Sequence, residues 1–187
     1  MKNLIILLSL LFISHHIESR EAANYYFTHI NGENGLSQSN VKAILQDSYG
    51  FMWFGTKNGL NRYDGTSIVQ IDCDDLVLGE ANHNIGALYE DKHRNIWVGT
   101  DRGIYIYNPV TDVFSKMNRE ADGVGVGNWV AKILKDSTDN IWALIPSQGA
   151  FRFKDENMYY YPITDQGNIK SESANSICVH EPGDIWV

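Results

Sequence analysis

The side chains with the clearest chemical potential in this sequence are one isolated tryptophan and several polar residues in loop-like segments. An aromatic ring can stack on the apolar face of a sugar while planar polar groups hydrogen-bond to its hydroxyls. Loops on a rigid scaffold are the usual place for binding residues. Trp129 has an alternative role, in which its ring only packs inside the fold. The candidate ligand-binding residues are Trp129, Arg102, Asp101, Asn58, His83 and Gln148.

Motifs for catalysis or metal binding are missing from the sequence. The segment 50–57 superficially resembles a phosphate-binding loop, but its Thr56 and Lys57 are transposed and its apolar interior indicates a strand. The acidic run at 72–75 lacks the glycine and the glutamate of a calcium-binding loop. No G-x-S-x-G, H-E-x-x-H or C-x-x-C sequence occurs. We therefore predict no catalytic residue, no metal site and no cofactor.

Composition excludes two further classes of protein. The chain has 187 residues, with 15 Lys and Arg against 23 Asp and Glu and a net charge of −8. Because no basic stripe is present, contact with nucleic-acid phosphates is disfavoured. An apolar content of 43% with 12% aromatic residues is also unlike a disordered chain. Cys73 and Cys178 are too few for a disulfide scaffold, and we expect free thiols.

A repeat organises most of the sequence. Four tryptophans are separated by 44, 45 and 44 residues. An aspartate stands six residues before each of the first three tryptophans, and a glycine stands six or seven residues after each of them. An aromatic residue follows four positions beyond each glycine. These columns are Trp53, Trp97, Trp142 and Trp186; Asp47, Asp91 and Asp136; Gly59, Gly103 and Gly149; and Tyr63, Tyr107 and Phe153.

The local chemistry of one unit predicts four short strands. In the first unit, the continuous apolar run 51–56 is expected for a strand that is covered on both faces. Asn58-Gly59 and Asp64-Gly65 are dipeptides that favour tight hairpins. Four antiparallel strands per repeat of this length are typical of a propeller blade. We predict an all-β fold: a β-propeller of four-stranded antiparallel blades, incomplete at about three and a half blades.

The repeated columns have predicted structural roles within this fold. The tryptophans fill the wedge between neighbouring blades, where burial of such a ring stabilises by about 2–3 kcal/mol. The turn aspartates hydrogen-bond to nearby backbone N–H groups.

The N-terminal residues predict a secretory signal. Lys2 precedes an apolar run at 4–13 that is too short to span a bilayer as a helix. No second long apolar stretch follows, so no membrane anchor is predicted in this chain. The predicted divisions are a signal peptide at 1–19, an outer strand at 20–34 that would close the ring, blades at 35–78, 79–122 and 123–167, and a truncated blade at 168–187.

One face of a propeller surrounds the mouth of its central channel. That face carries the loops that enter each innermost strand and the turns that join the second and third strands. All six candidate binding residues fall in these segments, and Trp129 breaks a column held by Asn40 and Asn84. By register the segments are 31–40, 57–59, 72–84, 101–103, 118–129, 146–149 and 164–175.

The repeats resemble the two-component-regulator propeller family. The resemblance extends over residues 25–187, but the third unit departs from it at 143–146 and the fourth carries His180 in place of the aspartate. The phrases that carry it are GLSQSNV at 35–41, D-x-x-G-F-M-W-F-G-T at 47–56, NGLNRYDG at 58–65 and D-x-x-x-N-I-W-V-G-T-D-R-G-I-Y at 91–105.

This resemblance implies the periplasmic sensor of a hybrid two-component system in glycan-utilising bacteria. Such receptors have two consecutive seven-bladed propellers, a sandwich-like domain, a membrane span, and the histidine kinase and response-regulator modules of a phosphorelay. The implied ligand is an oligosaccharide, and the implied partners are the remaining blades and the kinase. Whether the full-length receptor forms a homodimer is left open by the resemblance. The repeat motif is structural and therefore assigns no binding residue.

Two other functions stay open at this point. A protein-interaction propeller would use the same scaffold without a sugar. A propeller enzyme, such as a polysaccharide lyase, would need carboxylates or histidines that converge on one face, and the sequence shows no such cluster. Our prediction is a periplasmic sensing module that is not itself an enzyme.

Overall fold

The computed structural model describes residues 26–71, 84–163, 174–181 and 184–187. Apart from one short 3₁₀ helix, η1 (Gly32–Asn34), the regular structure of these residues is β-strand. The predicted signal peptide at 1–19 lies outside the described residues, as do His83 and Cys73.

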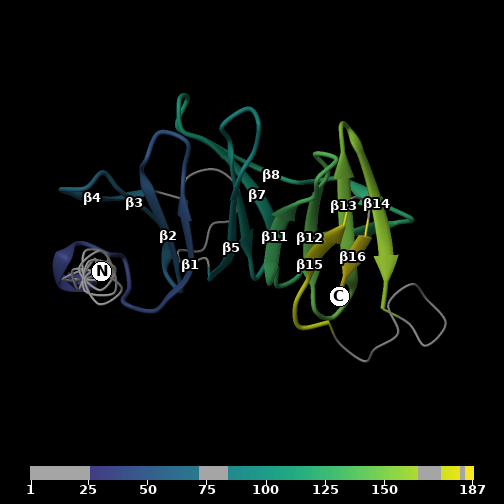
Figure 1. The fold of residues 1–187 in the computed structure, drawn as a ribbon, viewed down its shortest axis with the longest axis horizontal. Coiled ribbons are helices and arrows are strands. Elements are labelled where there is room, and N and C mark those ends of the chain that lie inside the picture. The colour runs from purple at the N-terminus through teal and green to yellow at the C-terminus, as the bar shows by residue number, and fades with distance from the viewer. Residues whose placement is uncertain (1–25, 72–83, 164–173, 182–183) are drawn as a thin grey trace, which may run out of the picture.

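Three four-stranded antiparallel sheets follow one another along the chain and stand side by side in Figure 1. In each sheet the strands are ordered as in the sequence, so every connection within a sheet is a hairpin. The predicted fold class is therefore confirmed. The first blade is β1 (Val41–Gln46), β2 (Met52–Thr56), β3 (Gly59–Tyr63) and β4 (Ile68–Ile71). The second is β5 (Ile85–Glu90), β6 (Ile96–Thr100), β7 (Gly103–Asn108) and β8 (Val113–Lys116). The third is β11 (Lys132–Lys135), β12 (Ile141–Ile145), β13 (Gly149–Lys154) and β14 (Asn157–Pro162).

Two smaller sheets complete the described structure. β15 (Cys178–Glu181) pairs with β16 (Asp184–Trp186), in line with the start of a further unit. β9 (Glu120–Ala121) and β10 (Val124–Gly125) form a hairpin inside the segment 118–129, which the sequence analysis treated as a loop. This hairpin contacts β14 of the third blade.

The core between blades is built from the tryptophan column and the aromatic column. Trp53 is fully buried, and its ring meets Tyr107 of the next blade edge to face at 5.7 Å between centroids. Trp97 meets Phe153 of the third blade in the same way at 5.2 Å. The aromatic residues of the second and third units thus cover the tryptophans of the units before them. Trp186 is 58% exposed.

A glycine in the second strand of one blade leaves space for a larger side chain of the next blade. A Cβ atom on Gly55 would lie 2.5 Å from Cγ2 of Ile85, the first residue of the next blade's inner strand. Gly99 has the same relation to Val130, at 2.7 Å. In the third blade Leu144 takes the glycine position, and a small residue, Ala174, packs in the same cluster. The larger residue of the third unit is therefore matched by a smaller residue on the facing side.

The described part of the predicted outer strand at 20–34 begins at Tyr26. Residues 26–30 have no regular secondary structure, and Tyr26 and Phe27 are each 91% exposed. A strand is stabilised by a neighbouring strand, and the described residues offer none at this place. The ring-closing role of 20–34 stays a prediction.

Candidate functional site

The turns between the second and third strands place three of the predicted residues on one face. In the first blade, Oγ1 of the buried Thr56 accepts from the N–H of Asn58 at 3.0 Å and donates to the carbonyl of Gly59 at 3.1 Å. In the second blade, Thr100 makes the equivalent bonds to Arg102 and Gly103 at 3.0 Å each. Each glycine has a left-handed φ, which closes the two-residue turn. Asn58 and Asp101 are exposed at the turn tips and Arg102 is half-buried.

The third blade has a different turn at this position. Ile145 replaces the threonine, the turn is one residue longer, and the N–H of Gln148 donates to the carbonyl of Ile145 at 2.9 Å. The carbonyl of Gln148 accepts from the hydroxyl of Tyr160 at 3.0 Å. Gln148 is half-buried, and its Oε1 has no hydrogen-bond partner among the described residues.

Trp129 lies against the innermost strands of the first two blades. Its ring edge packs on Gly86 of β5, where a Cβ atom would come within 2.4 Å of Cη2. The Nζ of Lys42, on β1, lies 4.9 Å from the ring centroid. The strand β5 contacts both β1 and β11, so the innermost strands converge. Half-buried Trp129, which precedes the first strand of the third blade, thus contacts the innermost strands of the other two. This position is compatible with both of its predicted roles.

The predicted binding residues that the structure describes come from separate segments of the three blades. Asp101 and Arg102 share one turn, and the N–H of Asp101 donates to the carbonyl of Asn84 at 3.2 Å. Asn58 and Gln148 lie on turns of different blades. The sequence analysis missed Lys42 and Gly86, the residues that contact Trp129. A glycine inside a strand often marks a close approach, and this was an available signal.

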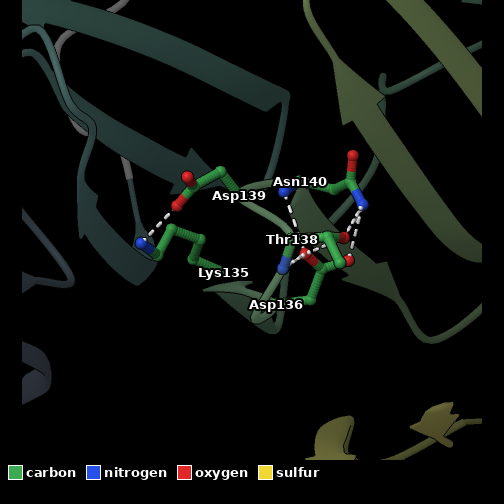
Figure 2. Close-up of polar contacts among 5 residues, drawn as sticks. All are labelled: Lys135, Asp136, Thr138, Asp139 and Asn140. Atoms are coloured by element: carbon green, nitrogen blue, oxygen red, sulfur yellow. Dashed lines mark hydrogen bonds and ion pairs between the residues drawn. The ribbon is translucent and has the colours of Figure 1, made fainter. Parts of the chain in front are cut away.

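The turn aspartates lie at the opposite face, where the first and second strands join. Oδ1 of Asp136 accepts from the N–H groups of Thr138 and Asn140 at 2.8 and 2.9 Å (Figure 2). Its Oδ2 accepts from the indole of Trp142 at 2.8 Å. Burial raises the pKa of Asp136, but these bonds from Trp142, Asn140 and Thr138 outweigh it, and the pKa lies well below its ordinary value. The arrangement is structural. In the described part of the chain no group of three His, Cys, Asp or Glu residues could hold a metal ion.

A groove of about 640 Å³ opens at this opposite face, between the second and third blades. Its walls include Tyr89 and Ile106 from the second blade and Asn140 and Phe153 from the third. None of the six predicted binding residues lines it. The sequence analysis placed the ligand face at the other end of the blades and did not find this groove.

Sequence comparison identifies the repeat. The family model described as "Two component regulator propeller" matches residues 35–58 and 79–102. A curated relative, Histidine kinase P4 of Formosa agariphila, is 43% identical over 61 residues, which are 33% of this chain and 4% of that protein. The chain therefore aligns with a small part of this relative.

Comparison with solved structures identifies the architecture. Two extracellular domains of putative hybrid two component systems from B. thetaiotaomicron superpose with a TM-score of 0.70, at 24% and 20% identity. They match 83% and 85% of this chain and 23% and 22% of their own lengths. A streptogramin B lyase superposes with a TM-score of 0.51 at 14% identity, over 66% of this chain and 40% of that one. At these identities the likeness shows the fold alone. Within the described residues, no helix has the length and apolarity needed to cross a bilayer.

Proposed function

We propose, for a chain that carries repeats of the two-component-regulator propeller family, that it is a segment of a periplasmic ligand-sensing β-propeller. In this proposal the propeller binds an oligosaccharide and signals to a histidine kinase that regulates glycan-utilisation genes. The blades at 35–78, 79–122 and 123–167, the signal peptide at 1–19 and the remaining blades of the receptor belong to the same proposal. Similarity to a histidine kinase over 61 residues and to extracellular propeller domains supports it.

The position of Trp129 is the observation that carries the ligand part of this proposal. Its ring bridges three blades, with the ammonium group of Lys42 over one face. A sugar that displaced Lys42 from this face would stack on the ring, while the neighbouring turns offer the side chains of Asn58, Asp101 and Arg102. Because these turns belong to different blades, ligand binding would favour one packing of the blades over another. A shift between two such arrangements is a means of signalling to the next domain.

Calorimetry of the complete receptor ectodomain with a panel of oligosaccharides tests this function. We expect one of them to bind without turnover, and Trp129→Ala to weaken its binding about tenfold or more, whereas Trp129→Phe keeps a ring and stays within about threefold. A matched control, Val110→Ala, changes a side chain that is 87% exposed on a distant turn and leaves binding unchanged.

Each contrary outcome has its own meaning. An unchanged affinity in Trp129→Ala would show that the ligand binds elsewhere. Turnover of a sugar would favour the enzyme alternative. Failure of the whole panel to bind would favour a protein-interaction propeller.

A further inference from the structure

We propose that the groove between the second and third blades is a separate binding site, for a neutral hydroxylated ring such as one pyranose unit. It lies at the opposite face of the blades from Trp129. Its existence is independent of the proposed function, and only the choice of a sugar as ligand rests on it. The volume of about 640 Å³ is in the range of small-molecule sites.

A departure from the repeat coincides with the groove. In the first blade Arg62 pairs with Trp53 across β2 and β3, and its guanidinium lies 4.9 Å from the ring of Phe51 and 5.9 Å from that of Trp53. In the third blade Arg152 pairs with Trp142 and lies 5.8 Å from its ring. The second blade has Ile106 in this position, paired with Trp97. Ile106 is shorter than arginine, and it lines the groove together with Trp97.

The inner wall of the groove is apolar. The rings of Trp97 and Phe153, in edge-to-face contact at 5.2 Å, are both buried. Ile106 and Tyr89 are half-buried beside them, and the buried Met117 is also a lining residue. Burial raises the pKa of Tyr89, so its hydroxyl stays protonated at neutral pH. The wall thus offers an apolar surface for the C–H face of a ring together with a neutral hydroxyl group.

The rim carries charges of both signs in nearly equal number. Several acidic groups already have partners: Asp91 accepts from Trp97, Asp139 pairs with Lys135, and Glu90 accepts from Ser48. With five acidic and four basic lining residues, the charge of the rim is nearly balanced and gives an ionic ligand of either sign little net attraction. Hydroxyl groups, in contrast, can donate to the acids and accept from the bases. The charged lining residues are Lys92, Arg119, Lys135, Lys154, Glu90, Asp91, Asp139, Asp155 and Glu156.

Asn140, a lining residue of the groove, has a side-chain oxygen without a hydrogen-bond partner in the described structure. It is 7% exposed and uses its Nδ2 to donate to Oδ2 of Asp136 and Oγ1 of Thr138, both at 2.7 Å. These two acceptors define the orientation of the amide, so the remaining atom is the oxygen. Figure 2 shows this oxygen pointing away from Asp136 and Thr138, and it has no hydrogen-bond partner in the described structure. A buried acceptor without a donor is unfavourable. Because this oxygen is closed to solvent, it lies beside the groove without being a contact for a ligand in it.

Ile106→Arg tests the site, because it restores in the second blade the side chain that the first and third blades carry. Calorimetry of the complete ectodomain would use methyl glucoside, methyl galactoside and methyl mannoside as probes. We expect at least one to bind the wild type, Ile106→Arg to weaken it about tenfold or more, and Ile106→Leu to stay within about threefold. Val110→Ala, which changes a side chain that is 87% exposed and outside the groove lining, should leave this binding unchanged.

Thermal unfolding shows whether Ile106→Arg folds. If it does not, Tyr89→Phe removes a single hydroxyl group, and we expect it to weaken binding about threefold or more. Equal binding by the wild type and the folded variant, or no binding of any glycoside by the wild type, would overturn the groove site. Loss of oligosaccharide binding in Trp129→Ala with no effect of Ile106→Arg would overturn this inference and leave the proposed function standing.

Discussion

The indole Nε1 of Trp53 donates a 2.8 Å hydrogen bond to Oδ2 of Asp47, six residues earlier in the chain. The other oxygen of the same carboxylate accepts from the N–H groups of Tyr49 and Phe51 at 3.0 and 2.9 Å. One buried side chain therefore both orders a turn and orients the ring that fills the space between blades. The same indole–carboxylate bond recurs in the second and third blades, at 3.1 and 2.8 Å.

Trp53→Phe tests the energetic weight of this bond. The variant keeps an aromatic ring but leaves Oδ2 of a buried carboxylate without its donor, so we expect the free energy of unfolding to fall by about 3 kcal/mol. Chemical denaturation measures the change. Tyr26→Phe removes a hydroxyl group from a side chain that is 91% exposed and should leave the free energy of unfolding unchanged. A loss for Trp53→Phe no larger than for this control would contradict the role of the bond.

Stability should depend on the ionisation of Asp136. Its pKa is depressed in the folded state, so the stabilisation is fully present above the ordinary value of 3.8 and is lost as the pH falls below it. We expect Asp136→Asn to cost about 2 kcal/mol at neutral pH and the difference from the wild type to shrink between about pH 4 and pH 2. Melting temperatures across this range measure the effect.

Asp139→Asn is the matched control for this pH dependence. Asp139 stands on the same turn and its pKa is lowered by the hydrogen bond from Lys135, but its side chain is 72% exposed. A solvated ion pair contributes little to stability. If Asp139→Asn flattened the pH profile as much as Asp136→Asn, the buried carboxylate would not be the relevant group.

Gly55 and Ile85 should be energetically coupled across the first interface. Gly55→Ala alone places a methyl group against Cγ2 of Ile85 and should destabilise by about 1–3 kcal/mol. Ile85→Ala alone leaves a cavity and should cost about 2–5 kcal/mol. In the double variant the new methyl group enters the vacated space, so we expect a favourable coupling of about 1 kcal/mol or more in a double-mutant cycle.

Gly50→Ala is the control that distinguishes a steric clash with Ile85 from backbone strain at a glycine. Gly50 has a φ of +93°, but no atom lies within 4 Å of an added Cβ. Its substitution should destabilise through strain alone and should combine additively with Ile85→Ala. If the effects of Gly55→Ala and Ile85→Ala were additive within about 0.5 kcal/mol, the side chain of Ile85 would not depend on the space that Gly55 leaves.

Gly86→Ala should displace Trp129 without removing it. The added Cβ would lie 2.4 Å from Cη2 of Trp129 and 2.7 Å from the carbonyl oxygen of Val130. We expect the tryptophan fluorescence to change and oligosaccharide affinity to fall about as far as in Trp129→Ala. Gly125→Ala, whose nearest atom would be 3.6 Å away, is the control and should leave both unchanged. Unaltered binding by Gly86→Ala would argue against the Trp129 site.

The blade could be predicted because its signals are local. The dipeptide Asn58-Gly59 sets one hairpin, and the apolar run around Trp53 indicates a strand that is covered on both faces. The hairpin β9–β10 was missed although its turn, Asp122-Gly123, is of the same kind, because strands of two residues carry no alternating pattern.

The candidate sites were much harder to predict. The segment that contains Trp129 could be assigned to a face from the repeat register, but its contacts with Gly86 and Lys42 join three different blades. The groove depends on Ile106, whose significance appears only when its neighbours in the next blade are known. Contacts between blades connect residues that lie 30 positions or more apart, such as Gly55 and Ile85, and no local pattern encodes which of them meet.

The amino-acid order alone determined the class of fold, the periodic sheets and the chemistry of the turns, since each of these arises from a few adjacent residues and is repeated several times. The tertiary structure alone decided how one blade fits the next: that Gly55 receives Ile85, that Leu144 packs with Ala174, and that a groove opens beside Ile106. The physical reason is that packing depends on complementary volumes brought together in space, and complementarity belongs to a pair of surfaces rather than to either stretch of chain.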